Sequence, residues 1–417
     1  MKPDNFRGVF REDLDARGVY SEAAGIARIV PLAIAIPVDE QDVSALVRWA
    51  SREGHALIPR GSGSGMAGGA IGKGIIVDLS RLNTLGEVDV ERKRIKVGAG
   101  VLRDQVDAAA RASGLRFPVD PSSGAFCTLG GMVATNAAGA RTLRHGATRA
   151  WVNALDCVFS DGNRAIITRG EAPPAHIEPI RRFMQEAHAT IIASDRKKPM
   201  RHESVRKESS GYAVHAYSEQ ADIIDLIVGS EGTLAIIVAA QLSLAPVAGA
   251  TSSVLGSFPS LESAASAATM AVAGGASACE LLDRTFLAFA LTGDSADPGV
   301  RAKVEGAEAI LLAEVEADTP QEAAAGARQL ASAFSAAGAT ACDIALTPEA
   351  ERQLWELRHA ASPILSALKD SISMQFIEDG AVPLDKLPEY VRGVREALAA
   401  RGVTGVIFGH AGDAHVM

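Results

Sequence analysis

The chain has 417 residues, of which 47% are hydrophobic, and its formal net charge at pH 7 is −9. This length predicts two domains that each bury a core, and the apolar fraction is typical of folded proteins. The negative charge disfavours nucleic acid or an anionic membrane as the main partner.

No apolar run is long enough to form a transmembrane segment. The best candidate, residues 29–38, is short and contains Pro31 and Pro37, so we expect an edge strand there. Charged residues interrupt any N-terminal signal peptide. The four cysteines form no CxxC pair, which disfavours disulfides and an iron–sulfur cluster within this chain. We expect a cytoplasmic protein, and the sequence leaves peripheral association with the inner membrane open.

The first half of the chain predicts a mixture of helices and strands. A helix is expected over 39–52, because Asp39 can cap it, Gly54 can end it and its apolar residues form one stripe. A hairpin is expected at 151–168, where Asp161–Gly162 suits a tight turn. The other expected elements are strands at 56–58, 75–79, 94–97 and 234–244 and a helix at 102–113. Small residues after Pro246 mark a domain boundary, which divides the chain into 1–247 and 248–417.

The second half repeats a β-α-β unit. The first copy is expected as strand 252–258, helix 260–273 and strand 278–282, and the second as strand 309–315, helix 320–336 and strand 341–346. Small-residue turns follow the two helices at matching places. Two such units predict an α+β sandwich of the ferredoxin-like kind.

A glycine-rich loop, residues 59–74 (PRGSGSGMAGGAIGKG), joins two expected strands. Its GxGxxG pattern would indicate a Rossmann NAD site only if a helix began there, and each glycine opposes a helix by about 1 kcal/mol relative to alanine. Its end resembles a P-loop, but Ala67 and Gly74 replace the required glycine and Ser/Thr. A NAD site and a kinase-like site are therefore disfavoured. Consecutive small residues expose backbone N–H groups that can form an anion nest, which favours a pyrophosphate site over a merely flexible loop.

The loop resembles the pyrophosphate loop of the vanillyl-alcohol-oxidase-type (PCMH-type) FAD-binding proteins. Two further segments match the family in order, DPSSGAFCTLGGMVATNAAG at 120–139, followed by Arg144–Gly146, and GSEGTLAII at 229–237. The resemblance implies a two-part FAD-binding domain over 1–247 that holds FAD non-covalently.

The resemblance also implies roles for individual residues in three groups. The diphosphate group comprises Arg60, Gly61, Ser62, Gly63, Ser64 and Gly65. The flavin and ribityl group comprises Pro121, Thr128, Gly131, Thr135 and Gly139, and the nucleotide group comprises Glu231, Gly232 and Ile237. For the two threonines, helix or turn capping is the alternative role.

The C-terminal half resembles the branch of this superfamily that contains D-lactate dehydrogenase, the glycolate oxidase FAD subunit and D-2-hydroxyglutarate dehydrogenase. The matching segments are WELR at 355–358, IEDGAVP at 377–383 and FGHAGD at 408–413. The resemblance implies a substrate (cap) domain over 248–417 that is incomplete at its C-terminus, since family members continue past Met417.

Arg358 is the candidate substrate clamp. A helix is expected from Pro348, with Thr347 as its N-cap, and Arg358 falls at the margin of the apolar stripe. A guanidinium fork is suited to a carboxylate, and Ser362 could add a hydrogen bond. The alternative is a surface arginine paired with an acid.

His410 and His415 follow an expected strand at 405–408. The resemblance implies a divalent metal such as zinc near His410, but its second histidine position is Met417 here, so His415 would have to substitute. Two loop histidines without a metal are the alternative.

The resemblance implies oxidation of a small D-2-hydroxy acid by hydride transfer to flavin N5, with Arg358, His410 and Ser362 as the catalytic residues. Electrons would pass to a quinone, a cytochrome or an iron–sulfur protein or domain. Three alternatives stay open, namely a truncated FAD-binding protein without turnover, another oxidase or alkyl-transfer enzyme on the same fold, and a nucleotide-binding module without redox chemistry.

Overall fold

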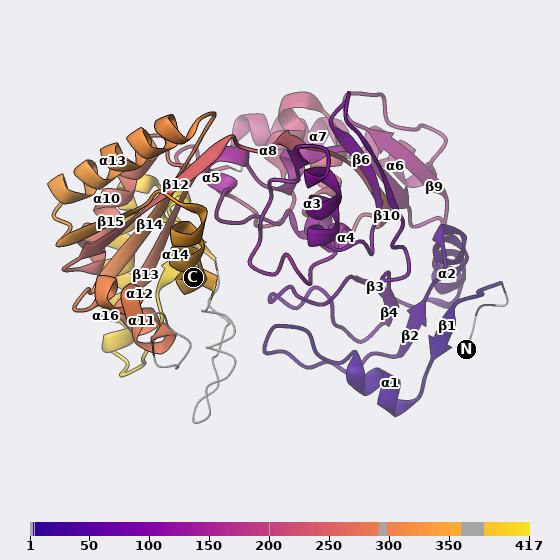
Figure 1. The fold of residues 1–417 in the computed structure, drawn as a ribbon. Helices are drawn as coiled ribbons and strands as arrows, with labels where there is room; N and C mark the ends of the chain where they lie inside the picture. Colours follow the sequence, from indigo (N-terminus) through magenta and orange to yellow (C-terminus); the bar gives the residue numbers. More distant parts are fainter. Residues whose placement is uncertain (1–2, 4, 200, 292–297, 360–378) are drawn as a thin grey trace. The chain divides into compact units, whose positions relative to one another are not determined.

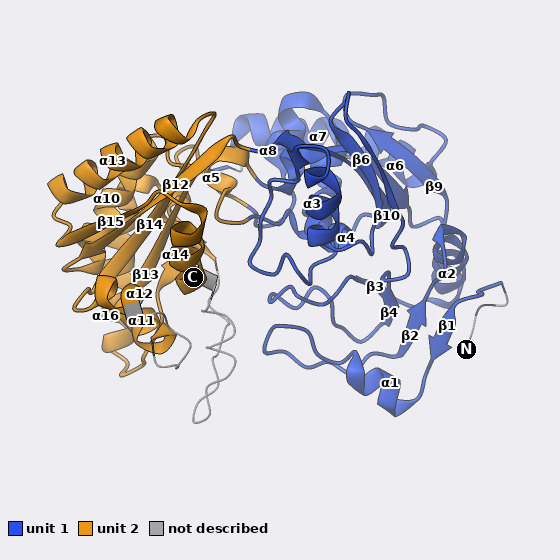
Figure 2. Ribbon diagram, in the orientation of Figure 1, with its two compact units in different colours: residues 1–138, 147–201, 209–247 blue, residues 139–146, 202–208, 248–417 orange. Residues whose placement is uncertain are grey.

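The computed structural model describes the chain except for residues 1–2, 4, 200, 292–297 and 360–378. It contains two compact units (Figure 2). Unit 1 comprises residues 1–138, 147–201 and 209–247, and unit 2 comprises 139–146, 202–208 and 248–417. Two short segments from the first half of the sequence therefore fold with the second unit. In the part of the chain that the structure describes, no helix has the length and apolar character needed to cross a membrane.

Unit 1 begins with a four-stranded sheet in the order β1-β2-β4-β3. Its strands are β1 (Val9–Arg11), β2 (Ala33–Ile36), β3 (Leu57–Arg60) and β4 (Ile75–Asp78). The expected edge strand at 29–38 is wrong in its position, because β2 pairs with β1 on one side and with β4 on the other. The short strand β1 carries too little apolar pattern to be predicted, so the second neighbour of β2 was missed.

Helix α2 (Glu40–Glu53) confirms the first predicted helix and both of its ends. The Asp39 side chain accepts hydrogen bonds from the backbone N–H groups of Gln41 and Asp42, and Gly54 ends the helix at a φ of 74°. The apolar stripe of α2 packs on β2 and β4.

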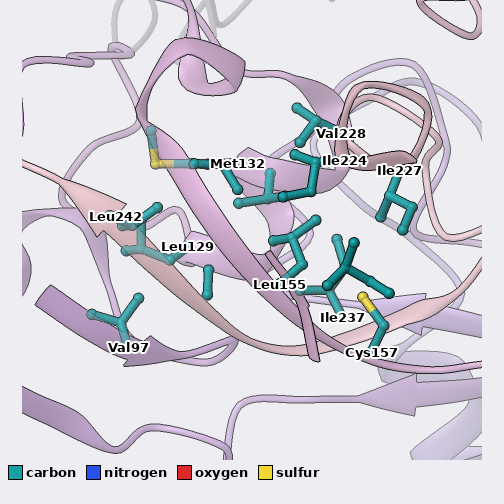
Figure 3. Close-up of a cluster of buried hydrophobic side chains, with 14 of the residues drawn as sticks. Val97, Leu129, Met132, Leu155, Cys157, Ile224, Ile227, Val228, Ile237 and Leu242 are labelled. Atoms are coloured by element: carbon teal, nitrogen blue, oxygen red, sulfur yellow. The ribbon is translucent and has the colours of Figure 1, made fainter. Parts of the chain in front are cut away.

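The second sheet of unit 1 is antiparallel, in the order β5-β6-β10-β8-β9. Its strands are β5 (Leu85–Asp89), β6 (Arg94–Gly98), β8 (Val152–Val158), β9 (Arg164–Thr168) and β10 (Ile236–Ser243). The predicted hairpin is confirmed as β8 and β9, with Gly162 at a φ of 76° in the turn. Figure 3 shows side chains of α4 (Leu129–Thr135) and α9 (Ile223–Ile227) packed against those of β6, β8 and β10.

Shorter elements complete unit 1. They are α1 (Leu14–Val19), α3 (Arg103–Arg111), β7 (Leu115–Arg116), η1 (Thr148–Trp151), α6 (Glu178–Glu186), α7 (His188–Lys197), α8 (Val214–Gln220) and β11 (Ala245–Pro246).

Unit 2 confirms the ferredoxin-like prediction. Its first unit is β12 (Ala250–Phe258), α10 (Leu261–Ala273) and β13 (Ala278–Asp283), and its second is β14 (Ala309–Ala317), α13 (Pro320–Ala336) and β15 (Ala341–Ala345). The antiparallel sheet has the order β15-β12-β14-β13-β17, in which the repeated units contribute strands four, one, three and two, as in ferredoxin-like folds. The extra strand β17 (Phe408–Gly409) pairs with β13.

The two faces of the unit 2 sheet differ in character. Helices α10 and α13 cover one face (Figure 1), and alanines fully buried at their contact allow a close approach. The other face carries an apolar cluster with α11 (Arg284–Ala290) and α14 (Pro348–His359), together with three buried glutamates, Glu280, Glu314 and Glu316. The other elements in the described part of unit 2 are α5 (Thr142–His145), α12 (Pro298–Val304), β16 (Gly380–Ala381), η2 (Leu384–Lys386), α16 (Leu387–Ala399), η3 (Ala411–Asp413) and β18 (His415–Val416).

The N-cap of α11 predicts a dependence of stability on pH. Asp283 accepts a hydrogen bond from the Phe286 N–H at 2.8 Å, and its burial raises the pKa of its carboxyl to about 6. Since the unfolded carboxyl has a pKa near 4, the folded protein binds more protons between pH 4 and 6, and its stability falls as the pH rises through this window. Asp283→Asn keeps the cap and loses the charge, so it is expected to be more stable than the wild type at pH 7 by about 2–3 kcal/mol.

Thermal unfolding at pH 4.5 and pH 7 measures this difference. Asp39→Asn is the matched control at another N-cap, because backbone N–H groups and Arg7 outweigh burial and lower the pKa of Asp39. That variant is expected to lose stability at pH 7 relative to the wild type. Equal stability of Asp283→Asn and the wild type at both pH values would contradict the assignment.

Candidate functional site

The glycine loop of unit 1 lies directly against the start of α4. The Thr128 hydroxyl caps this helix by accepting a hydrogen bond from the Gly131 N–H. A Cβ added at Gly61 would lie 2.2 Å from the Thr128 Oγ1, which is closer than real Cβ atoms approach. Only glycine therefore fits where the loop meets α4.

The third motif segment reaches the same place. The N–H groups of Gly229 and Glu231 donate to the carbonyls of Val133 and Ala134 at 3.0 and 2.9 Å, at the C-terminal end of α4. Its Gly232 lies against the start of the glycine loop, since an added Cβ would be 2.9 Å from Cγ of Pro59. The structure thus brings together three motif segments that lie far apart in the sequence.

This junction is suited to an anionic group such as a pyrophosphate. Residues 61–65 are all glycine or serine, so their side chains shield the backbone N–H groups little. Among the described residues, the Ser230 hydroxyl is buried without a hydrogen-bond partner. A bound group that accepts backbone N–H bonds and contacts this hydroxyl would satisfy both features.

Arg60 holds the loop rather than facing outward from it. Its guanidinium donates to the carbonyls of Glu22 and Ala70 at 2.8 and 3.2 Å and lies over the ring of Tyr20. Within the loop, the hydroxyls of Ser62 and Ser64 are 3.2 Å apart.

The other sequence-predicted cofactor residues have varied surroundings. The carbonyl of Pro121 accepts from Gly124, and the hydroxyl of Thr135 donates to Gly131 within α4. Gly139 lies in unit 2, where its N–H donates to the hydroxyl of Thr142. The side chain of Ile237 lies in the hydrophobic core (Figure 3), so only its backbone can contribute to a site.

In unit 2, Arg358 and His410 meet at a single buried carboxylate. The two oxygens of Glu280 lie 2.6 Å from Nε of Arg358 and 2.6 Å from Nδ1 of His410. The Glu280 side chain is fully buried. Burial by itself would raise its pKa, but the charges and hydrogen bonds of His410 and Arg358 prevail and lower the pKa of Glu280 to about 2.

The fold explains why these residues meet. Strand β13 carries Glu280 and pairs with β17, which His410 follows directly. Arg358 approaches from α14, whose start is capped by the Thr347 hydroxyl. Arg358 is only 6% exposed, with its guanidinium over the ring of Phe408, so it is not a surface arginine. Ser362 lies outside the described residues.

His415 stacks on His410 with ring centroids 5.3 Å apart. Its Nε2 lies 2.9 Å from an oxygen of Asp379 and 3.1 Å from Nζ of Lys207. Burial lowers the pKa of His415.

One ring nitrogen of each histidine is already occupied. Lys207 and Asp379 lie at Nε2 of His415 and Glu280 at Nδ1 of His410, whereas Nδ1 of His415 is buried without a hydrogen-bond partner. Across the residues that the structure describes, no group of three or more His, Cys, Asp or Glu side chains is placed to hold a metal.

Sequence reasoning missed several charged residues around the unit 2 cluster and on the same face of its sheet. Glu280 gave a readable signal, because an acid with apolar residues on both sides in the strand ACELLD requires a buried partner. Lys207, Glu314 and Glu316 gave none, since their partners come from distant segments. Arg141 binds Glu314, and Nε2 of His145 lies 3.0 Å from Glu316, so segment 139–146 is attached to β14.

In the comparison with known proteins, each half of the chain matches a protein-family model. Residues 31–167 match the family model described as FAD binding domain, and residues 249–417 match FAD linked oxidases, C-terminal domain. The chain is 28% identical to a D-2-hydroxyglutarate dehydrogenase of Pseudomonas putida, with 100% of this chain and 44% of that protein covered. It is 29% identical to a D-lactate dehydrogenase of Archaeoglobus fulgidus, with coverages of 91% and 73%. It is 27% identical to a glycolate oxidase subunit of Bacillus subtilis, with coverages of 99% and 77%.

A solved structure of alkyldihydroxyacetonephosphate synthase has the same fold, with a TM-score of 0.65 and 16% sequence identity. The match covers 96% of this chain and 74% of that one. This likeness concerns the fold alone. The chain spans less than half the length of the D-2-hydroxyglutarate dehydrogenase, so the activity of that whole protein is not transferred with the similarity.

Proposed function

The chain belongs to the FAD-linked oxidases, and on that premise we propose that it oxidises a small D-2-hydroxy acid to the 2-oxo acid. The observation that carries this proposal is the buried Arg358–Glu280–His410 cluster, which offers a carboxylate-binding cation beside an imidazole. The named activities of the relatives, on 2-hydroxyglutarate, lactate and glycolate, support the same substrate class. We take 1–247 as the FAD-binding domain and 248–417 as the substrate domain.

FAD would be held non-covalently in unit 1. The backbone N–H groups of residues 61–65 would bind its diphosphate where the loop meets Thr128, and Glu231 and Gly232 would border the nucleotide. When bound, FAD supplies the acceptor for the hydride from C2 of the substrate. A quinone, a cytochrome and an iron–sulfur protein are the candidates for the final electron acceptor.

The roles of the unit 2 residues follow from their chemistry. The guanidinium of Arg358 would bind the substrate carboxylate through its two Nη groups, because Nε is directed at Glu280. His410 would accept the proton of the 2-hydroxyl at Nε2, since its Nδ1 faces Glu280. Fixed charges that orient the substrate and stabilise developing alkoxide charge lower the barrier to oxidation.

Anaerobic addition of substrate to the purified yellow protein tests the proposal. D-lactate, glycolate or D-2-hydroxyglutarate is expected to bleach the absorbance of oxidised flavin, whereas L-lactate, the mirror image of the first, is expected to leave it unchanged. If every 2-hydroxy acid leaves the flavin oxidised while dithionite reduces it, the proposed activity is wrong. That result would favour the alternative of a flavoprotein without turnover.

A further inference from the structure

We propose that Glu280 is the positioning residue of this site, because its two carboxylate oxygens set the orientation of both Arg358 and His410. This inference rests on the proposed function, since it concerns how those two residues are presented to a substrate. Glu280 itself is fully buried and so acts through its neighbours rather than on the substrate.

Strand pairing and two short contacts hold the backbone and side chain of Glu280 in one position. It lies near the middle of β13, which pairs with β14 on one side and β17 on the other, so the backbone beneath it is fixed by both neighbours. Each oxygen contacts one partner at 2.6 Å. A carboxylate that makes two short, charge-assisted contacts in a buried position holds its partners in one arrangement.

For His410, the carboxylate determines which ring nitrogen carries the proton. A carboxylate oxygen only accepts hydrogen bonds, so Nδ1 of His410 must be the donor. In the neutral ring the lone pair is then on Nε2, the nitrogen that faces away from Glu280. The stacked ring of His415 restrains the plane of the imidazole. Glu280 therefore presents His410 as a proton acceptor in a fixed direction.

For Arg358, the same carboxylate determines which edge of the guanidinium faces the substrate. Glu280 binds Nε, and the ring of Phe408 lies against the guanidinium with its centroid 5.3 Å away. The contact with Glu280 fixes the Nε edge of the guanidinium, and the contact with Phe408 fixes the direction of its plane. The edge with the two Nη groups is the one that suits a bidentate carboxylate.

Glu280→Gln disturbs both contacts, because it removes the charge and puts an amide N–H group in place of one acceptor oxygen. That N–H group would either repel the guanidinium of Arg358 or require Nδ1 of His410 to become an acceptor. In the flavin-loaded protein, the variant is expected to raise KM and lower kcat, with a total loss in kcat/KM of about 10- to 100-fold. Glu280→Asp keeps the charge and should recover part of this loss. Glu351→Gln is the matched control, since Glu351 is also a buried glutamate, on α14, but accepts its hydrogen bonds from Thr251 and Ser253.

Double substitutions test whether Glu280 acts through its two partners. With Arg358→Met, Glu280→Gln should no longer raise KM, and with His410→Gln it should no longer lower kcat. Independent, additive effects in both backgrounds would overturn the proposal. So would a Glu280→Gln protein with lower thermal stability but unchanged kcat and KM per bound flavin, which indicates a structural role alone.

Histidine ring nitrogen chemical shifts give a readout that does not require turnover. Wild-type protein should show His410 protonated at Nδ1, and Glu280→Gln should show a mixture of both tautomers. If the wild type oxidises no 2-hydroxy acid but the shifts change as expected, the proposed function fails and the positioning role stands. If the wild type is active and His410 carries its proton on Nε2, the positioning role fails.

Discussion

Replacing Arg358 with methionine is expected to lower kcat/KM for a 2-hydroxy acid by roughly 10²- to 10⁴-fold. Two hydrogen bonds from a guanidinium to a carboxylate are worth about 1.5–3 kcal/mol each, or about 3–6 kcal/mol together. Methionine keeps the length of the side chain but has no charge and no donor. Steady-state kinetics with D-lactate, glycolate and D-2-hydroxyglutarate, normalised to bound flavin, measure the effect.

Arg352→Met is the matched control, because Arg352 lies on the same helix with a side chain that is 57% exposed and bound to surface acids. It is expected to retain wild-type kinetics, since exposed ion pairs contribute little. Arg358→Lys keeps the charge without the fork and should have intermediate activity. Wild-type kinetics of Arg358→Met on carboxylate substrates would contradict the clamp and favour a different reaction on the same fold.

Replacing Gly61 with alanine is expected to weaken FAD binding by roughly 30- to 800-fold. The new Cβ would lie 2.2 Å from Oγ1 of Thr128, so either the loop or the start of α4 must move. Overpacking costs about 1–3 kcal/mol and a disturbed N-cap about 1 kcal/mol. The total of about 2–4 kcal/mol gives the stated factor. The amount of flavin that copurifies and the dissociation constant measured by flavin fluorescence both report the loss.

Thr128→Ala tests the cause of this loss. In the double variant, the atom of residue 128 nearest the new Cβ is its own Cβ at 3.4 Å, an ordinary contact, so FAD binding should partly recover. Gly18→Ala serves as the control in the same unit, because an added Cβ there has no neighbour within 4 Å. If Gly61→Ala binds FAD as tightly as the wild type, the loop is not held against α4 as the structure shows.

The parts of the fold that could be predicted are those governed by local rules. Asp39 and Gly54 bound α2 because caps act within one turn. The repeated β-α-β pattern of unit 2 was readable because alanine-rich helices and apolar strands alternate at even spacing. Strand β1 escaped prediction because its pairing with β2 is a tertiary contact between segments more than twenty residues apart.

The residues of the candidate site also fall into those that could be predicted from the sequence and those that depend on tertiary contacts. The glycine loop and Arg358 follow from composition, spacing and resemblance, because backbone N–H groups and guanidinium forks have characteristic uses. The contact of Lys207 with His415 joins residues 208 positions apart, and no periodicity relates them. Glu280 lies between these cases, since its burial was readable from the strand but its two partners were not.

The two segments 139–146 and 202–208 limit how this protein can be divided or recombined. The chain passes between the units at 138/139, 146/147, 201/202, 208/209 and 247/248, so unit 2 is not one continuous stretch of sequence. Residues 248–417 alone would contain Glu314 and Glu316 without Arg141 and His145, their partners in unit 2. An exchange of C-terminal halves between relatives would therefore have to preserve the match between these basic residues and the acids of β14. A chimera with a new C-terminal half is therefore expected to fold well only if positions 141 and 145 of the N-terminal half suit its acids.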